Sequence, residues 1–200
     1  MNKAAYEYLK KADPILGRFM DQVDMIKQKP RRLSCFESLV RAITNQQLSG
    51  RAAETIFGRF RALFPKCDFP CAADVLATDA DTLRGVGLSR PKAAYIRDLA
   101  SRMIAGTVPE LAEVDALTDE EILSRLTAIK GIGRWTVEML LIFNLGRPDV
   151  LPIHDLSIRK GFRIVFNKRK LPEPQAIEKY GERWRPHRTT ASLYLWRACE

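Results

Sequence analysis

The chain of 200 residues has few of the features that mark membrane-spanning or secreted proteins. Its longest uninterrupted apolar run, residues 139–143, is far shorter than the roughly 18 residues that a membrane span needs. The N-terminus lacks the apolar stretch of a secretory signal. We therefore expect a soluble intracellular protein.

Cysteine and histidine are scarce, with four and two residues respectively. Cys67 and Cys71 are four positions apart, but Cys35, Cys199 and both histidines lie far from them in the sequence. This spacing does not match a zinc site or an iron–sulfur cluster. We expect free thiols, no structural metal held by side chains, no iron–sulfur cluster and no cofactor for catalysis.

No segment alternates apolar and polar residues with a period of two, so the pattern of a β-sheet is missing. Apolar residues recur instead with helical spacing, as at Phe36, Leu39, Val40 and Ile43. A helix, a Gly-x-Gly turn and a second helix are predicted twice, around residues 85–87 and 131–133. The sequence therefore predicts an all-α fold.

The limits and faces of several helices are also predicted. Three residues have the pattern of helix N-caps, namely Asp13, Ser34 and Thr118. One helix should span residues 134–145, and the helix that begins at Asp155 should place Ile158 and Phe162 on one apolar face. Trp196 is expected on the apolar face of the last helix.

Positive charge is the first feature that the chain has in excess. There are 33 Lys and Arg residues against 24 Asp and Glu, a net charge of +9. Such a balance suits a polyanionic partner, although many basic proteins bind no nucleic acid. The excess is spread along the chain, so the fold must assemble any basic surface.

The second Gly-x-Gly turn lies in residues 126–136, where one helix ends and the next begins at once. The backbone amides of Gly131, Gly133 and Arg134 then sit at a helix N-terminus, which attracts anions. With Lys130 and Arg134 beside it, a DNA phosphate is a natural occupant. The same glycines also fit an ordinary helix end followed by a new helix.

Asp155 begins a predicted helix, directly after a loop that ends in His154. Asp is a preferred N-cap residue, so its position has a purely structural explanation. His154 fits either a pH-sensitive neighbour of Asp155 or a solvated loop side chain.

Residues 130–162 together resemble the helix-hairpin-helix (HhH-GPD) DNA glycosylase superfamily, whose signature is a hairpin, a Gly/Pro-rich loop and a catalytic Asp. Segments 36–49 and 87–96 are similar to the same family, and 182–196 resembles its DNA-3-methyladenine glycosylase II branch. The resemblance implies a two-lobed helical fold without an N-terminal β-domain.

The implied lobes have definite ranges. One is a central lobe of about 34–146 that ends in the hairpin, and the other combines about 1–33 with 147–200. The resemblance places the active site in the cleft between them.

The implied activity is hydrolysis of the N-glycosidic bond of alkylated bases, of the 3-methyladenine and 7-methylguanine type, in base excision repair. Asp155 would stabilise an oxocarbenium-like transition state. Bifunctional relatives carry a Schiff-base Lys where this chain has Trp135, so no lyase step is expected. The expected partner is double-stranded DNA containing alkylated bases; no membrane partner is expected, and the protein should act as a monomer. The resemblance implies a cytoplasmic, nucleoid-associated location in a bacterium or a nuclear one in a eukaryote.

The resemblance also implies roles for other residues. Trp135, Trp184 and Met139 would form the base pocket; the alternative for each is an ordinary core residue. Gln47, assisted by Leu48, would fill the gap left by the flipped base, unless this segment merely ends a helix. DNA phosphate would be bound by Lys130, Gly131, Gly133, Arg134 and Thr136. A Na⁺ or K⁺ ion would be held by the main-chain carbonyls of Thr127, Ile129 and Ile132.

Two other functions stay open. A non-catalytic helix-hairpin-helix DNA-binding protein would explain the charge and the hairpin, but not Asp155 with Trp135 and Trp184. A glycosylase for mismatched or oxidised bases would share the fold, but its commonest branches carry the lysine and the cysteine cluster that this sequence lacks.

Overall fold

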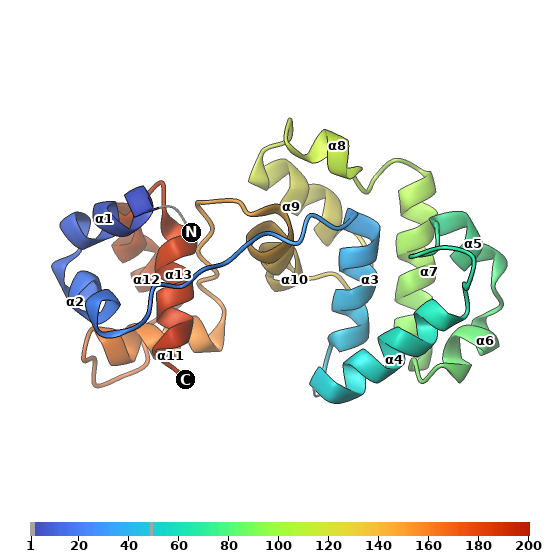
Figure 1. Ribbon diagram of the computed structural model, residues 1–200, viewed down its shortest axis with the longest axis horizontal. Coiled ribbons are helices and arrows are strands. Elements are labelled where there is room, and N and C mark those ends of the chain that lie inside the picture. The colour runs from blue at the N-terminus through green and yellow to red at the C-terminus, as the bar shows by residue number, and fades with distance from the viewer. Residues whose placement is uncertain (1–2, 49) are drawn as a thin grey trace. The chain divides into compact units, whose positions relative to one another are not determined.

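The computed structural model describes residues 3–48 and 50–200, and these residues form helices and loops without a β-strand (Figure 1). The prediction of an all-α fold is confirmed. Ser49, the last residue of the segment 36–49, lies outside the described residues. No helix in the described ranges has both the length and the apolar character of a membrane span.

The chain divides into two compact units. Unit 1 combines residues 1–31 with 141–200, and unit 2 comprises residues 32–140. The second division falls inside the helix that was predicted over residues 134–145. At that point the α-helix Arg134–Met139 gives way to a π-helix, Leu140–Leu145. Wide turns of this kind interrupt the regular ladder of backbone hydrogen bonds.

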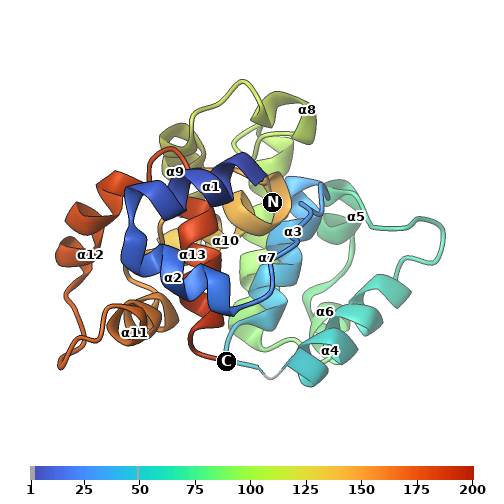
Figure 2. The same cartoon turned by 60° about the vertical axis from the view of Figure 1, so that its left-hand side comes forward.

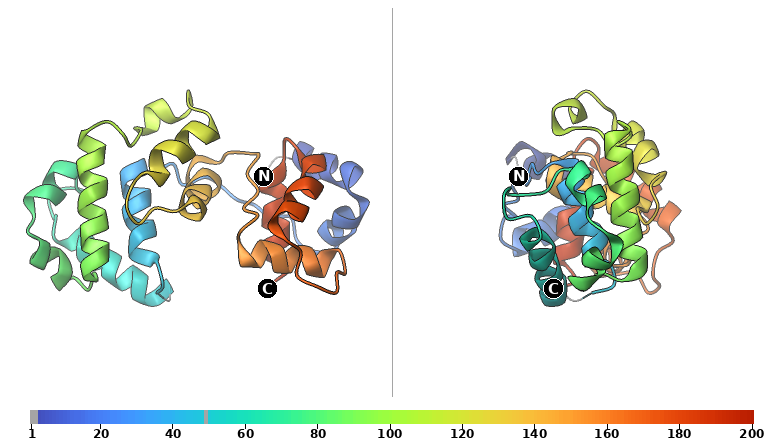
Figure 3. Two further views of the ribbon diagram at one scale, coloured as in Figure 1. Left: turned by 180° about the vertical axis from the view of Figure 1, so that it is seen from behind. Right: turned by 90° about the vertical axis from the view of Figure 1, so that its right-hand side faces the viewer.

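Unit 2 is built around α7 (Arg90–Ile104), which packs against α3, α5 and α6. Figure 3 shows α7 and α3 running side by side. The other helices of this unit are α3 (Cys35–Asn45), α4 (Gly50–Ala62), α5 (Ala72–Ala77), α6 (Ala80–Gly85), α8 (Leu111–Val114), α9 (Asp119–Thr127) and α10 (Arg134–Met139). The core of the unit includes Leu39, Ile96 and Leu99, which are fully buried.

Unit 1 surrounds α13 (Arg188–Arg197), which packs against α11 and α1 (Figure 2). The remaining helices are α1 (Lys3–Ala12), α2 (Pro14–Gln22), the π-helix η1 (Leu140–Leu145), α11 (Leu156–Val165), α12 (Pro174–Gly181) and the 3₁₀-helix η2 (Glu182–Trp184). The predicted apolar face of α11 is confirmed, since Ile158 and Phe162 lie in the core of this unit.

Local capping signals were read correctly from the sequence. Asp13 caps α2, Ser34 accepts the N–H of Glu37 at the start of α3, and Thr118 forms a reciprocal capping box on α9. These contacts span only a few residues, so tertiary packing does not decide them.

The Asp13 carboxylate joins this local capping to the core of unit 1. One oxygen accepts the N–H groups of Ile15 and Leu16 at 3.1 Å each, and the other accepts the indole N–H of Trp184 at 2.9 Å. We expect Asp13→Ala to lower the free energy of unfolding by about 2–4 kcal/mol, because a cap is lost and a buried donor loses its acceptor. Urea denaturation measures this change. Asp24→Ala, on an exposed residue, is the control, and equal stability of the two variants would contradict the assignment.

Candidate active site

Asp155 is the N-cap of α11, as the sequence predicted. Its Oδ1 accepts the backbone N–H of Ile158 at 2.9 Å and the indole Nε1–H of Trp196 at 3.1 Å. The residue is half-buried, so its carboxyl group is not enclosed in the apolar core. Two donors on one oxygen, one from the backbone and one from a large ring, hold the carboxylate in a defined orientation.

The contact between α11 and α13 brings Trp196 to Asp155. Gly161 lies in the middle of α11, and a Cβ atom there would come within 1.9 Å of the carbonyl oxygen of Leu195. Only glycine allows the two helix backbones to approach so closely. Trp196 follows Leu195 directly, so this close approach fixes the distance between the indole and the start of α11.

The loop that leads to Asp155 is fastened to the start of α13. Arg188 donates to both carboxylate oxygens of Asp149, at 2.8 and 3.0 Å, and to its carbonyl oxygen at 2.9 Å. Thr189 Oγ1 accepts the N–H of Val150 at 2.9 Å and donates to the carbonyl of Arg147 at 2.7 Å. The bidentate Arg pair and these backbone contacts restrict the loop before it reaches Asp155.

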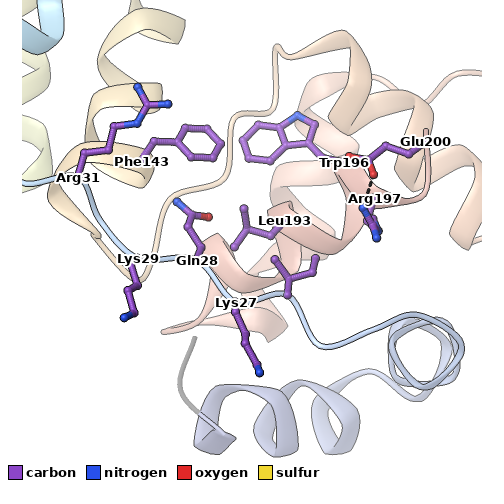
Figure 4. Close-up of a pocket in the computed structure, with 10 residues that line it drawn as sticks. Lys27, Gln28, Lys29, Arg31, Phe143, Leu193, Trp196, Arg197 and Glu200 are labelled. Atoms are coloured by element: carbon purple, nitrogen blue, oxygen red, sulfur yellow. Dashed lines mark hydrogen bonds and ion pairs between the residues drawn. The ribbon is translucent and has the colours of Figure 1, made fainter.

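Trp196 also lines a cavity of unit 1, with a volume of about 520 Å³ (Figure 4). Its ring stacks on that of Phe143 from η1, with centroids 5.6 Å apart and planes inclined by 29°. Lys27, Lys29 and Arg31 line the same cavity. The sequence placed Trp196 only on the apolar face of the last helix, so its contact with Asp155 was missed.

The expectation that Trp184 lines a base pocket is wrong in this structure. Its side chain is fully buried, its Nε1–H is bound to Asp13, and its ring packs among Phe162, Phe166 and Tyr180. A ring without an exposed face cannot stack on a base. His154 is exposed, as expected for a solvated loop side chain.

In unit 2, the hairpin between α9 and α10 needs its first glycine. Gly131 has φ +81°, and a Cβ atom there would lie 2.3 Å from the ring of Tyr95. Asp98 of α7 accepts the backbone N–H of Lys130 at 3.2 Å. The turn is therefore held against α7 by both packing and a hydrogen bond.

The end of the hairpin exposes backbone donors. Gly133 is the N-cap of α10 and offers no side chain as an acceptor, so the first N–H groups of the helix have no capping side chain. Arg134 pairs with the buried Glu138 at 2.9 Å, which offsets part of its charge. Lys130 is exposed and forms no ion pair within the described residues. Thr136 is 6% exposed, and its backbone N–H is one of the first N–H groups of α10.

The segment predicted to act as a wedge lies next to the hairpin. Gln47 and Leu48 are exposed on the turn after α3, and Gln47 has φ +56°. The preceding Gln46 donates from Nε2 to the carbonyl of Gly131 at 2.7 Å. The sequence did not single out Gln46, because only the fold brings these two turns together.

Lys92 of α7 secures the same turn from the other side. Its Nζ donates to the carbonyls of Thr44 and Gln46 at 2.8 and 2.7 Å, at the C-terminal end of α3. Partial burial lowers the pKa of Lys92 from its ordinary value. Gln46 thus joins the hairpin to the wedge turn (residues 46–48), and Lys92 holds that turn to α7. The hairpin and the wedge turn form one surface of unit 2.

The remaining candidates also lie in unit 2. Trp135, in the first turn of α10, is 51% exposed, and Met139 one turn later is half-buried. Thr127 ends α9, and Ile129 accepts the N–H of Ile132 at 3.1 Å. Asp155 and Trp196 belong to unit 1, so the predicted site draws on residues of both units.

Comparison with known proteins gives consistent matches. The profile of the HhH-GPD superfamily, described as base excision DNA repair protein, matches residues 40–186. DNA-3-methyladenine glycosylase 1 of Schizosaccharomyces pombe is 39% identical over 191 residues, covering 96% of this chain and 82% of the relative. The solved structure of the S. pombe 3-methyladenine DNA glycosylase Mag1 in complex with abasic DNA has a TM-score of 0.85 at 38% identity, covering 97% of this chain and 95% of that one. A DNA-3-methyladenine glycosidase of Bacillus halodurans has a TM-score of 0.89 at 31% identity, covering 97% and 88%.

Two glycine-to-alanine substitutions test the geometry of the hairpin. Gly131→Ala should destabilise the protein by more than about 1 kcal/mol, because alanine is strained at positive φ and its Cβ would meet Tyr95. Gly58→Ala, in the interior of α4 with open space around it, should stabilise by about 0.5–1 kcal/mol. Denaturant midpoints give both values. A neutral or stabilising effect of Gly131→Ala would show that the turn does not need glycine.

Proposed function

This chain belongs to the HhH-GPD superfamily of base excision DNA repair proteins, and we propose that it is a monofunctional DNA glycosylase that hydrolyses the N-glycosidic bond of alkylated bases. The observation that carries the proposal is the Asp155 carboxylate, oriented by Ile158 and Trp196 and left half-buried. Asp13 also caps a helix and accepts an indole N–H, but it is buried, whereas Asp155 stays partly exposed and can face a substrate.

The carboxylate supplies the electrostatic part of the reaction. As the bond between base and sugar breaks, positive charge grows on the deoxyribose. A fixed negative group interacts more strongly with this charge than with the neutral sugar of the ground state, which lowers the barrier. Asp155 also orients the water that attacks the sugar from the side opposite to the departing base.

Alkylated bases suit this site because they need little help in leaving. A 3-methyladenine or 7-methylguanine base carries positive charge before the bond breaks, so protonation by a general acid is unnecessary. The exposed ring of Trp135 can stack on such a cation, with an energy of about 1–2 kcal/mol when water is excluded. Met139, one turn further along α10, supplies an apolar contact.

The surface of unit 2 that joins hairpin and wedge turn is the proposed DNA-binding site. The first N–H groups of α10 and the Lys130 side chain bind a phosphate, while Gln47 and Leu48 enter the space left by the extruded base. The carbonyl groups of Thr127, Ile129 and Ile132 are proposed to hold a monovalent cation. The partial negative charge at the C-terminal end of α9 supports this proposal. When bound, the ion would link the turn to a phosphate.

Replacing the carboxylate by an amide is the direct test of catalysis. Asp155→Asn keeps a side chain that can cap α11, so folding and DNA binding should persist. Release of free 3-methyladenine from methylated DNA should fall by at least about 100-fold. Asp79→Asn changes another N-cap aspartate in the same way and should retain activity. Full activity of Asp155→Asn would disprove the role of the carboxylate.

The chemistry after base release distinguishes a monofunctional enzyme from a lyase. Trp135 has no amine, so borohydride added during the reaction should trap no covalent complex with DNA. Abasic sites should accumulate in intact strands until they are treated with alkali. A trapped complex at the size of protein plus DNA would mean that another amine attacks the sugar.

A further inference from the structure

Unit 1 carries a strongly charged surface that the proposed reaction does not use. Residues 156–172, here called the basic segment, comprise α11 and the loop after it. The segment contains no carboxylate, and its six cationic residues are Arg159, Lys160, Arg163, Lys168, Arg169 and Lys170. Neither the proposed catalysis by Asp155 nor the proposed binding by the hairpin requires this excess of positive charge.

The fold presents most of these cations to solvent. Ile158, Gly161 and Phe162 face the core and fix the orientation of α11, so Lys160 and Arg163 lie exposed on its other side. Lys168, Arg169 and Lys170 are exposed in the loop. None of these five cations forms an ion pair in the part of the chain that the structure describes.

The loop has a defined backbone, so its charges are held in place. Asn167 has φ +47°, and the N–H groups of Asn167 and Lys168 bind the carbonyls of Ile164 and Arg163 at 3.2 and 2.9 Å. These two bonds form the pattern in which an α-helix ends at a residue with left-handed backbone angles. The far side of the loop is tied by Arg159, which donates to the carbonyl of Pro172 at 2.9 Å.

We propose that the basic segment is a second DNA-contacting surface, which binds the phosphate backbone of the duplex beside the damaged base. This inference rests on the proposed function, because it takes the polyanion to be the DNA on which Asp155 acts. These unpaired cations can bind phosphate groups, and such contacts do not depend on the DNA sequence. Asp155 caps one end of α11 and the loop follows the other end, so the helix itself sets the distance between reaction and contact.

That distance predicts where the contact falls on DNA. A helix of 10 residues spans about 15 Å, which corresponds to about four or five base pairs of duplex. The cations therefore meet the backbone a few base pairs from the base that is removed. Duplexes that end closer to the damage should lose this contact.

The test compares two double variants that remove the same charge. Lys168→Ala/Lys170→Ala changes the basic segment, and Lys3→Ala/Lys11→Ala changes two exposed lysines of α1. The affinity for a long duplex with one central abasic site, which defines the flanking base pairs, is measured over a range of salt concentrations. The first variant should reduce the slope of log K against log salt by about 2, and the second should leave it near the wild-type value.

On a short duplex that lacks the flanking base pairs, the two variants should have the same slope of log K against log salt. An unchanged slope for Lys168→Ala/Lys170→Ala on the long duplex would overturn the proposal, as would an equal loss in both variants. If these lysines only stabilise the end of α11, the variant should lower the unfolding midpoint and leave the slope unchanged.

Release of 3-methyladenine by the wild-type protein is measured in parallel. Loss of slope together with wild-type base release supports both proposals. If the slope of the variant is reduced but the wild-type protein releases no base, the second DNA contact is supported and the glycosylase proposal is refuted. If the wild-type protein releases base and the slope of the variant is unchanged, only the second surface is refuted.

Discussion

The structure of the candidate site depends on one carboxylate oxygen that accepts two hydrogen bonds. Asp155 Oδ1 receives the N–H of Ile158, which belongs to its own helix, and the indole N–H of Trp196, which comes from another. The first bond is local and follows from N-capping. The second requires α11 and α13 to lie in contact, and Gly161 makes that contact possible by admitting the carbonyl of Leu195.

Contacts made by two residues at the start of α13 serve the same carboxylate. Arg188 and Thr189 fasten the loop before Asp155 to the start of α13, the helix that carries Trp196 near its other end. Loop, helix and indole are therefore fixed to a single element. A group that must face developing positive charge gains from this arrangement, because it pays no reorganisation cost during the reaction.

Unit 2 applies the same principle to binding. The hairpin turn and the wedge turn are each irregular, with left-handed backbone at Gly131 and Gln47. Gln46 joins them by a hydrogen bond, and Lys92 holds the second turn to α7. These hydrogen bonds hold the two turns in one geometry, which the proposed DNA contact requires.

The sequence predicted what short-range chemistry decides. The caps at Asp13, Thr118 and Asp155, the glycine hairpin and the all-α fold all follow from contacts within a few residues or from helical periodicity. The sequence did not show which of Trp184 and Trp196 lies near Asp155, because both occur in helical segments of the C-terminal region. Only packing shows that Trp184 is buried against Asp13 and that Trp196 meets Asp155. The sequence also did not predict the π-helix after Met139, since its residues are as apolar as those of an ordinary buried α-helix.

The central claim is that Trp196 contributes to the reaction through Asp155, and a double-mutant cycle on the single-turnover rate of base release tests it most directly. Trp196→Phe keeps an aromatic ring and removes only the N–H donor. It should slow base release in the wild-type background and have no further effect in the Asp155→Asn background. An equal fold-reduction in both backgrounds would show that Trp196 acts independently of the carboxylate and would contradict the account.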